Sequence, residues 1–495
     1  MSYIIAIDQG TTGTKVCAYD AEGNAAASAY REFTQHFPQP GYVEHDPEEI
    51  WQSVIAPLES VLRQLPDCSI AGIGITNQRE TTVVWDKNTG RPIHNAIVWQ
   101  CRRTARRCDE IPQDKRDRIR SLTGLPVDAY FSATNIEWIL RNVPSAMDSA
   151  ERGELAFVTI DSWLLWKLTG GRVHATDPTN ASRTMLFDID RREWASELLE
   201  IFNIPAKMLP DVMRSSGVFG STDSIGSLPS GVPICGIAGD QQAALFGQAC
   251  CAAGAMKCTY GTGSFLLLNV GDTRPHSDHG LIVTIACGED GRPVYALEGS
   301  VFVAGAAIQW LRDGLKILSS AAESEDMALS VPDTGGVYFV PALTGLGAPY
   351  WDQEARGSIY GLTRSTDSRH IVRAALEAMC YQTKDVLDAM AKDSGLEVNE
   401  LRIDGGASAN EFVCRFQADI LGIDVLRPSI IETTSLGAAC LAGLAIGFWN
   451  PDDIARRRSG DRVFSPQMPP DQADRLYRGW QDAVRRTLSS KAHPH

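Results

Sequence analysis

Residues 3–19 read Tyr-Ile-Ile-Ala-Ile-Asp-Gln-Gly-Thr-Thr-Gly-Thr-Lys-Val-Cys-Ala-Tyr, and this stretch indicates the architecture of the chain. A short β-branched apolar run over 3–7 meets a Gly/Thr turn at 10–13, and a second apolar run follows over 16–19. Turn-forming residues over 20–24 end the second run. The pattern predicts a β-hairpin whose turn is made of small residues.

A similar unit recurs in the second half of the chain. Residues 257–260 lead into Gly261-Thr262-Gly263-Ser264, and residues 265–270 form the expected return strand. Such weak internal repetition predicts two lobes of related topology that face each other.

Other segments fit an α/β plan. We expect buried strands over 70–76 and 232–238, and a strand over 401–403 that runs into Asp404-Gly405-Gly406. Helical periodicity covers 48–65 and 370–390, and a buried Ala/Gly-rich helix is expected over 435–448. Small residues cluster over 247–254, where we place the boundary between the lobes.

The 495-residue chain carries a formal net charge of −15, with 44% hydrophobic and 22% charged residues. Its length exceeds that of most single domains, which supports two cores. A strongly acidic protein repels the phosphates of nucleic acids and anionic lipids, so we expect neither nucleic-acid binding nor membrane insertion. A nucleotide remains compatible, because backbone N–H groups, metal ions and a few local cations hold it.

The 12 cysteines form no CxxC pair, which favours reduced and mostly buried thiols in a cytoplasmic protein. The N-terminus has no basic segment, and Asp8 interrupts its apolar run, so it does not resemble a signal peptide.

The first turn suits phosphate, because consecutive backbone N–H groups and threonine hydroxyls form a concave donor surface. Asp8 precedes it at a strand end, where a carboxylate is placed to hold Mg²⁺. An ordinary hairpin turn is the alternative. The echo at 261–264 and the Asp404-Gly405-Gly406 strand end favour a clamp on one nucleotide. No GxxxxGK[ST] run, helix-opening GxGxxG or GxSxG motif occurs.

Asp240 is the favoured catalytic carboxylate. It follows an apolar strand and precedes a small-residue helix, so its alternative role is that of an N-cap. Two glutamines follow it, which favours recognition of hydroxyl groups. Arg79 and Glu80 also follow a strand, where they form either a surface pair or a grip on vicinal hydroxyls. Four arginines, Arg102, Arg103, Arg106 and Arg107, read mostly as a solvated helix face.

Several ordered stretches carry a resemblance that covers nearly the whole chain: residues 74–82, 98–103, 177–186, 236–248, 260–263, 305–313, 345–351 and 404–406. The chain resembles the glycerol-phosphorylating members of the FGGY carbohydrate kinase family, within the actin/hexokinase-like ATPase superfamily. The resemblance implies two RNase H-like domains with an active-site cleft between them. It assigns the polyol and the first phosphate turn to residues 1–248, and the nucleotide to residues 249–495.

The resemblance also implies transfer of the γ-phosphoryl group of ATP to glycerol, giving sn-glycerol 3-phosphate, with Asp240 as general base and Mg²⁺ near Asp8 and Asp240. It assigns glycerol contacts to Arg79, Glu80, Trp99, Tyr130, Asp240, Gln241 and Phe265. It assigns nucleotide contacts to Thr11, Thr12, Gly13, Lys15, Thr262, Gly305, Gln309, Gly406 and Asn410. We also expect a homo-oligomer.

Some residues depart from the family pattern. Gly13, Lys15 and Asn135 stand where relatives often carry Ser, Arg and Lys. Residues 221–232 contain no Arg or Lys, so we expect no inhibition by a sugar bisphosphate at that segment. Two alternative functions remain: a kinase for another polyol or ketose, such as xylulose or ribulose, and a non-catalytic nucleotide switch of the actin type.

Overall fold

A computed structural model describes residues 1–65, 69–430, 432–456 and 460–489 of the chain. The chain divides into two compact units. Unit 1 comprises Met1–Cys251, Val283–Tyr295 and Glu432–Arg457, and unit 2 comprises Ala252–Ile282, Ala296–Ile431 and Arg458–His495. The first division therefore falls close to the predicted 248/249 boundary, and two later segments return to unit 1.

A six-stranded sheet forms the centre of unit 1, in the order β13 (Ser216–Ser221), β14 (Pro233–Gly239), β5 (Ser69–Asn77), β1 (Ser2–Gln9), β2 (Gly13–Tyr19) and β3 (Ala25–Glu32). β1 is parallel to β5, and β5 is parallel to β14, while β2, β3 and β13 pair antiparallel to their neighbours. The predicted first hairpin is confirmed as β1 and β2.

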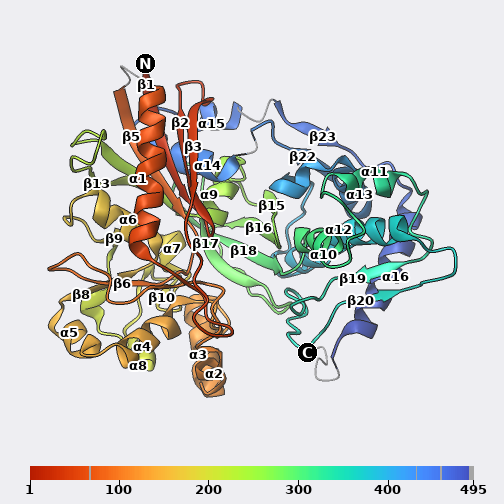
Figure 1. Ribbon diagram of the computed structural model, residues 1–495, viewed down its shortest axis with the longest axis horizontal. Helices are drawn as coiled ribbons and strands as arrows, with labels where there is room; N and C mark the ends of the chain where they lie inside the picture. Colours follow the sequence, from red (N-terminus) through yellow and green to blue (C-terminus); the bar gives the residue numbers. More distant parts are fainter. Residues whose placement is uncertain (66–68, 431, 457–459, 490–495) are drawn as a thin grey trace. The chain divides into compact units, whose positions relative to one another are not determined.

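Helices cover both faces of this sheet. α1 (Pro47–Gln64) packs on β2 and β3, and Figure 1 shows it running along the strands. Tyr3, Ile5 and Ile7 join its apolar cluster. Because successive side chains of a strand point to opposite faces, Asp8 lies on the other face. There α14 (Thr433–Ala445) packs on β1, β5 and β14.

A seven-stranded sheet repeats this order, with β17 (Ile282–Cys287) as an added edge strand. It runs β17, β18 (Pro293–Val301), β16 (Ser264–Gly271), β15 (Met256–Tyr260), β21 (Glu400–Asp404), β22 (Asp424–Arg427) and β23 (Arg462–Phe464). β15 pairs antiparallel with β16 and parallel with β21, as β1 does with β2 and β5. β22 is parallel to β21 and antiparallel to β23. The predicted internal duplication is confirmed.

The main helices of unit 2 gather around α12 (Ser368–Ser394). Asp367 and His370 form a capping box at its start, and Gly395 ends it in the left-handed conformation. Its neighbours are α10 (Gly305–Asp313), α11 (Glu323–Leu329), α13 (Glu411–Leu421) and α16 (Pro470–Thr487), with the small sheet of β19 (Tyr338–Val340) and β20 (Ser358–Tyr360).

Shorter elements complete the described chain. In unit 1 they are β4 (Glu44–His45), β6 (Val83–Asp86), β7 (Ala96–Ile97), α2 (Ala105–Asp109), α3 (Gln113–Thr123), α4 (Ser132–Asn142), α5 (Ala146–Arg152), β8 (Leu155–Val158), α6 (Ile160–Leu168), β9 (Ala175–Thr176), α7 (Pro178–Ala181), β10 (Phe187–Asp188), β11 (Glu193–Trp194), α8 (Ser196–Phe202), η1 (Ala206–Met208), β12 (Asp211–Val212), α9 (Asp240–Gly247) and α15 (Pro451–Arg456). In unit 2, η2 (Gly406–Ala409) follows β21.

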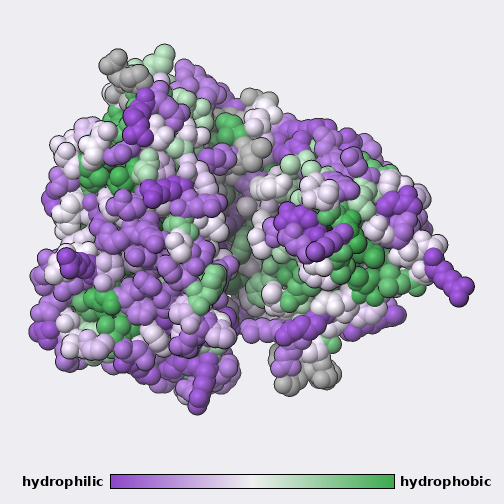
Figure 2. Space-filling view, in the orientation of Figure 1, coloured by the Kyte–Doolittle hydropathy of each residue, from purple (hydrophilic) through white to green (hydrophobic). Residues whose placement is uncertain are grey.

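The polar surface and the thiols agree with the sequence. Hydrophilic side chains cover most of the face seen in Figure 2. The 11 cysteines that the structure describes are free thiols, and all except Cys251 are buried. Among the described residues, no helix is both long enough and apolar enough to span a membrane.

Glycines let α14 approach its neighbours closely. A Cβ atom at Gly74 of β5 would lie 2.2 Å from the Ala438 carbonyl oxygen. A Cβ atom at Gly437 would lie 1.8 Å from the Ala243 carbonyl oxygen of α9. Backbone atoms cannot yield as a flexible side chain does, so these positions require glycine. α14 and α9 therefore fix the position of each other at backbone contact.

We predict that Gly437→Ala destabilises the protein by about 1–3 kcal/mol through overpacking. The loss occurs although alanine is otherwise the better helix former by about 1 kcal/mol. Thermal unfolding followed by circular dichroism measures it. Gly217→Ala in β13 is the control, because its added Cβ meets only an ordinary contact at 3.5 Å. Equal melting temperatures for the two variants would contradict the close packing of α14.

Candidate functional site

The carboxyl ends of three parallel strands meet at one edge of the unit 1 sheet. Asp8 of β1 lies level with Thr76 of β5, which lies level with Ala238 of β14. Because parallel strands end at the same edge, Asp8, the Arg79-Glu80 pair and Asp240 are brought together.

A chain of alternating charges runs along this edge. Arg79 Nε lies 3.2 Å from Asp240 Oδ1 and 3.9 Å from Glu80 Oε1. On the far side of Glu80, Arg183 Nε donates to Glu80 Oε1 at 2.5 Å. The side chains of Arg79, Glu80 and Arg183 are at most 2% exposed, while that of Asp240 is 30% exposed. Of these four side chains, only that of Asp240 therefore reaches solvent to a substantial degree.

The backbone at the strand ends aims these side chains. Glu80 has a φ of 63°, in the left-handed region that a residue with a long side chain rarely adopts. Ser132 Oγ and Thr82 Oγ1 donate to its carbonyl oxygen at 2.9 and 3.1 Å, which holds this conformation. Strain of this kind persists where the surrounding structure enforces it, and it is concentrated at functional sites.

Asp240 is the first residue of α9, and Gly239 is the N-cap, with no side-chain capping bond. The alternative reading of Asp240 as the N-cap is therefore wrong. Its Oδ1 accepts the Gln241 N–H at 2.7 Å and faces Arg79. The carboxylate is therefore anchored through that oxygen, just after the end of β14.

Aromatic rings stand beside the charge chain. Trp99 Nε1 donates to Thr11 Oγ1 at 3.0 Å, and the ring packs edge-on against Tyr130 with centroids 5.6 Å apart. The Arg183 guanidinium lies 5.6 Å from the centroid of Tyr130 and 5.3 Å from that of Phe131. Trp99 and Tyr130 are both half-buried. They therefore present apolar faces next to the charged groups.

Glutamine side chains support the turn between β1 and β2. The Gly10 N–H donates to the Gly13 carbonyl at 2.9 Å and closes the turn. Gln78 Nε2 donates to Gln9 Oε1 at 3.1 Å and to the Gly10 carbonyl at 3.3 Å. Gln35 Nε2 donates to the Thr11 carbonyl at 3.0 Å. These bonds satisfy the carbonyl groups of the turn and fix the shape of the turn.

Tyr30 accounts for the glycine at position 13. A Cβ atom there would lie 2.4 Å from the Tyr30 hydroxyl and 2.7 Å from the Arg31 carbonyl oxygen. The Tyr30 hydroxyl also lies 3.5 Å from Thr12 Oγ1. A hydroxyl from β3 thus occupies the place that a side chain at 13 would take. Lys15, another departure, forms an ion pair with Glu432 just before α14.

Burial raises the pKa of Asp8 from its ordinary 3.8 to about 7, and the Asp240 and Glu432 carboxylates add to this effect. The Lys15 ammonium acts in the opposite direction. Below about pH 7 the Asp8 carboxyl is therefore mostly protonated in the folded protein.

Unit 2 holds the remaining predicted residues at the equivalent place. The N–H groups of Ala304 and Ala306 donate to the Thr262 carbonyl at 2.9 and 3.0 Å, which docks the start of α10 on the 261–263 turn. A Cβ atom at Gly305 would lie 2.6 Å from the Gly261 carbonyl oxygen, so the close contact requires glycine. Gln309 is exposed one turn further along α10.

A second group follows β21 of unit 2. Asp404 lies level with Thr259 of β15, and Gly406 is exposed in η2 just beyond it. The Asn410 side chain accepts the Val413 N–H at 3.2 Å and caps α13. Phe265 is half-buried on β16, opposite Thr259.

The structure thus gathers the predicted residues in two sets, one in each unit. The unit 1 set is Asp8, Thr11, Thr12, Gly13, Lys15, Arg79, Glu80, Trp99, Tyr130, Asp240 and Gln241, and the unit 2 set is Thr262, Phe265, Gly305, Gln309, Gly406 and Asn410. Arg183 also belongs to the first set, but the sequence does not predict it. A lone arginine within residues 177–186 has no pattern that indicates its partner.

The prediction of a solvated basic face is wrong for Arg103. Its side chain is fully buried, pairs with Glu44 at 2.6 Å, and lies over the rings of Tyr42 and Trp138 at 4.2 and 4.6 Å. Arg106, in contrast, is 91% exposed and pairs with Glu110. The aromatic pair and the carboxylate draw one arginine of the run inward.

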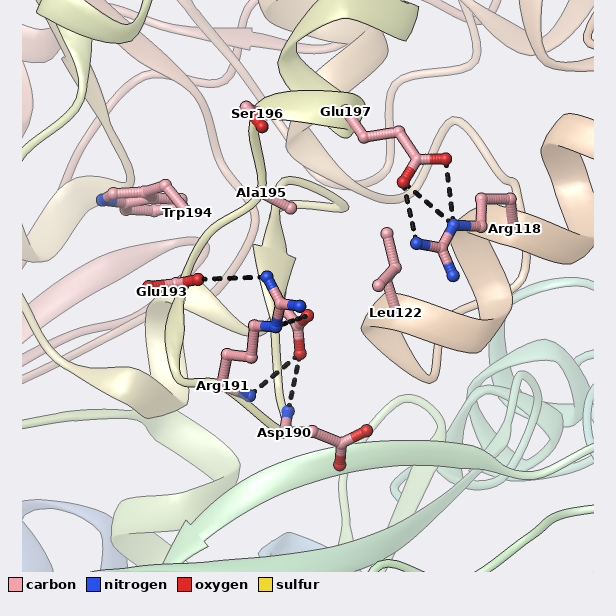
Figure 3. A pocket seen from close by; sticks show the side chains of 10 residues that line it. Arg118, Leu122, Asp190, Arg191, Glu193, Trp194, Ala195, Ser196 and Glu197 are labelled. Carbon is pink, nitrogen blue, oxygen red and sulfur yellow. Dashed lines mark hydrogen bonds and ion pairs between the residues drawn. The ribbon is translucent and has the colours of Figure 1, made fainter.

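A surface pocket of about 330 Å³ elsewhere in unit 1 contains none of these residues (Figure 3). Its charged side chains pair with each other, since Arg118 binds Glu197 at 2.8 Å and Arg191 lies 3.7 Å from Glu193. Such mutually satisfied surface pairs give no reason to place the site there.

Comparison with known proteins agrees with this geometry. Residues 3–247 match the model of the N-terminal domain of the FGGY family of carbohydrate kinases, and residues 256–446 match that of its C-terminal domain. The chain belongs to the FGGY family of carbohydrate kinases. The six- and seven-stranded sheets are thus those of a two-domain FGGY kinase, of the actin-like ATPase type.

Relatives of this FGGY kinase are similar over nearly their whole length. It is 58% identical over 489 residues to glycerol kinase of Carboxydothermus hydrogenoformans, covering 98% of each chain. It is 56% identical to glycerol kinase 2 of Thermotoga maritima, covering 99% of each chain. The crystal structure of Plasmodium falciparum glycerol kinase with ADP matches with a TM-score of 0.93 and 39% identity, covering 99% of each chain.

Because the pKa of Asp8 is raised, we expect this residue to lower the stability of the folded protein by an amount that depends on pH. Between about pH 4 and pH 7 the folded kinase holds a proton that the unfolded chain has released, so raising the pH through that window removes stability. Asp8→Asn avoids this loss. Without nucleotide or divalent cation, we expect its melting temperature to exceed that of the wild type by more at pH 8.5 than at pH 5.

Asp161, Glu377 and Asp385 also have a pKa raised to about 7, but they are present in both proteins and cancel in the difference. Thermal melts of the two proteins at both pH values make the measurement. A difference in melting temperature that does not change with pH would contradict the assignment to Asp8.

Proposed function

We propose that this FGGY kinase transfers the γ-phosphoryl group of ATP to glycerol, giving sn-glycerol 3-phosphate in glycerol catabolism. The observation that carries the proposal is the buried Arg79–Glu80 pair, which ends beside the partly exposed Asp240 at the edge that also holds the phosphate turn. The names of the relatives at 55–58% identity support glycerol as the acceptor.

The site suits a short polyol. Arg79 donates hydrogen bonds and Glu80 accepts them, so together they grip vicinal hydroxyls. Tyr130 and Gln241 complete the polar contacts, while Trp99 and Phe265 provide apolar surface for the carbons. A pair of charges with two rings matches three carbons better than a longer sugar, which needs more polar partners.

Asp240 is proposed as the general base. The transition state of phosphoryl transfer is loose, so positioning and charge neutralisation supply most of the catalysis. A carboxylate accepts a proton only in its ionised form, and the Arg79 guanidinium at 3.2 Å stabilises that charge. Asp240 then takes the hydroxyl proton as the new bond to phosphorus forms.

ATP is the phosphoryl donor expected of a kinase. Thr11, Thr12, Gly13 and Lys15 are proposed to contact its phosphates, as are Thr262 of the 261–263 turn and Gly305 at the start of α10. Gln309, Gly406 and Asn410 complete the nucleotide site. Residues 1–248 would thus serve polyol binding and the first phosphate turn, and residues 249–495 nucleotide binding.

Mg²⁺ fits the residues present. The donors near the strand edge, Asp8 and Asp240, are carboxylate oxygens, the ligands that Mg²⁺ prefers. Among the described residues, no group of three or more His, Cys, Asp or Glu side chains forms a metal cage. That agrees with an ion held by one or two carboxylates together with phosphates and water. When bound, it supplies positive charge next to the transferred phosphoryl group.

Cellular context remains a prediction. Free and mostly buried thiols support a cytoplasmic location. The homo-oligomer is likewise a prediction of the sequence, and the oligomeric state is measured by light scattering.

Substrate choice is tested by ADP release in a coupled assay with glycerol, erythritol and xylulose. We expect kcat/KM for glycerol to exceed the other two by at least about 10-fold, because a pocket for three carbons loses fit with each added group. A preference for xylulose would establish the ketose kinase instead. ATP turnover that ignores every polyol would establish the nucleotide switch.

The base is tested by Asp240→Asn. We expect kcat to fall by about 10²–10⁴-fold, the usual contribution of a general base. Unfolding temperature and ATP binding, measured by calorimetry, should stay close to the wild type. Asp223→Asn is the matched control, because that carboxylate is a half-exposed surface residue paired with Arg172. Near-normal glycerol phosphorylation by Asp240→Asn would exclude the assignment.

A further inference from the structure

Arg183 contacts two of the proposed glycerol-binding residues, Glu80 and Tyr130. Its Nε donates to Glu80 Oε1 at 2.5 Å, and its guanidinium lies over the ring of Tyr130. Its side chain is fully buried. A buried cation in this position sets both the orientation of a carboxylate and the position of a ring.

The strand edge itself holds Arg183 in place. The side chains of Asn77 and Asn180 exchange two hydrogen bonds of 3.0 and 3.1 Å, which ties α7 to the end of β5. Thr179 Oγ1 accepts the Gly239 N–H at 2.9 Å, which ties α7 to the end of β14. Arg183 lies two residues after α7 ends. The loop that carries it is therefore registered to the same strands that carry Arg79 and Asp240.

A pure packing role does not explain this arrangement. A buried arginine adds little net stability, because the cost of removing its charge from water offsets the gain from its ion pair. An arginine in this position keeps the buried Glu80 carboxylate ionised and fixes its orientation.

We propose that Arg183 is a positioning residue for polyol binding: it aims the Glu80 carboxylate and supports the Tyr130 ring, so that both meet the polyol hydroxyls. The proposal rests on glycerol being the acceptor. It assigns Arg183 to the polyol and not to the nucleotide, so its loss acts on one substrate of the two.

The test varies glycerol at saturating ATP, and then ATP at saturating glycerol. For Arg183→Met we expect the KM for glycerol to rise by about 100-fold, the cost of a contact displaced by about 1 Å. The KM for ATP should change by less than about 3-fold, because no nucleotide contact moves. Arg183→Lys keeps the charge but loses the planar fork, so the KM for glycerol should lie in between.

Two further variants separate positioning from folding. In the Glu80→Gln background, adding Arg183→Met should lower kcat/KM for glycerol by clearly less than it does in the wild-type background, because the charged partner is gone and only the contact with Tyr130 is lost. Arg103→Met is the matched control: Arg103 is equally buried, paired with Glu44 and placed over two rings. We expect that variant to melt at a lower temperature with an unchanged KM for glycerol.

The outcomes are distinct. A wild type that does not phosphorylate glycerol overturns the proposed function and this inference with it. A wild type that does so, beside an Arg183→Met variant with an unchanged KM for glycerol, overturns the inference alone. Equal rises in both KM values overturn it as well. If Arg183→Met does not fold, Arg183→Lys decides, and an unchanged KM for glycerol in that variant overturns the inference.

Discussion

Four charges alternate along one buried edge, and the site depends on their balance. Arg183, Glu80, Arg79 and Asp240 follow each other as cation, anion, cation and anion. Removing one partner of a buried pair typically costs about 3–5 kcal/mol, since it leaves a charge without compensation. The four charged side chains therefore depend on each other, and the loss of one disturbs the whole row. Asp240, at the end of the row, is the most exposed of the four side chains, and its Oδ1 is anchored by the Gln241 N–H.

The sheet makes this edge possible. Three parallel strands end level with each other, so Asp8, Arg79 and Asp240 meet at one edge although they are far apart in the sequence. Gly74 lets α14 touch β5 at backbone distance, and Gly437 lets α14 touch α9, so that helix and strands are packed closely beneath the edge. Glu432 lies just before α14 and forms an ion pair with Lys15, so the same helix also sets the electrostatics around Asp8. The unit 2 sheet repeats the order of strands and places Thr262 and Gly406 where unit 1 places Thr11 and Arg79.

Much of this organisation is visible in the sequence, because hairpins and strand ends leave local patterns. The runs around Gly10 and Gly261 predicted both hairpins, and apolar strands followed by polar residues marked Asp8, Arg79 and Asp240. The partners that those residues choose are long-range and leave no such pattern. The contacts of Arg183 and Tyr30 are of this long-range kind. So are those of the buried Arg103, which is the same type of residue as the exposed Arg106. The sequence also does not predict that residues 432–456 belong to unit 1, because the fit of Gly437 against α9 is a long-range contact.

The central claim is that the residues of the unit 1 strand edge hold the polyol. A crystal structure of the protein with glycerol tests it directly. We expect glycerol hydroxyls within hydrogen-bonding distance of Arg79, Glu80 and Asp240, with the carbon chain against Trp99. Glycerol bound elsewhere, or an Asp240 carboxylate that touches no hydroxyl, would contradict it.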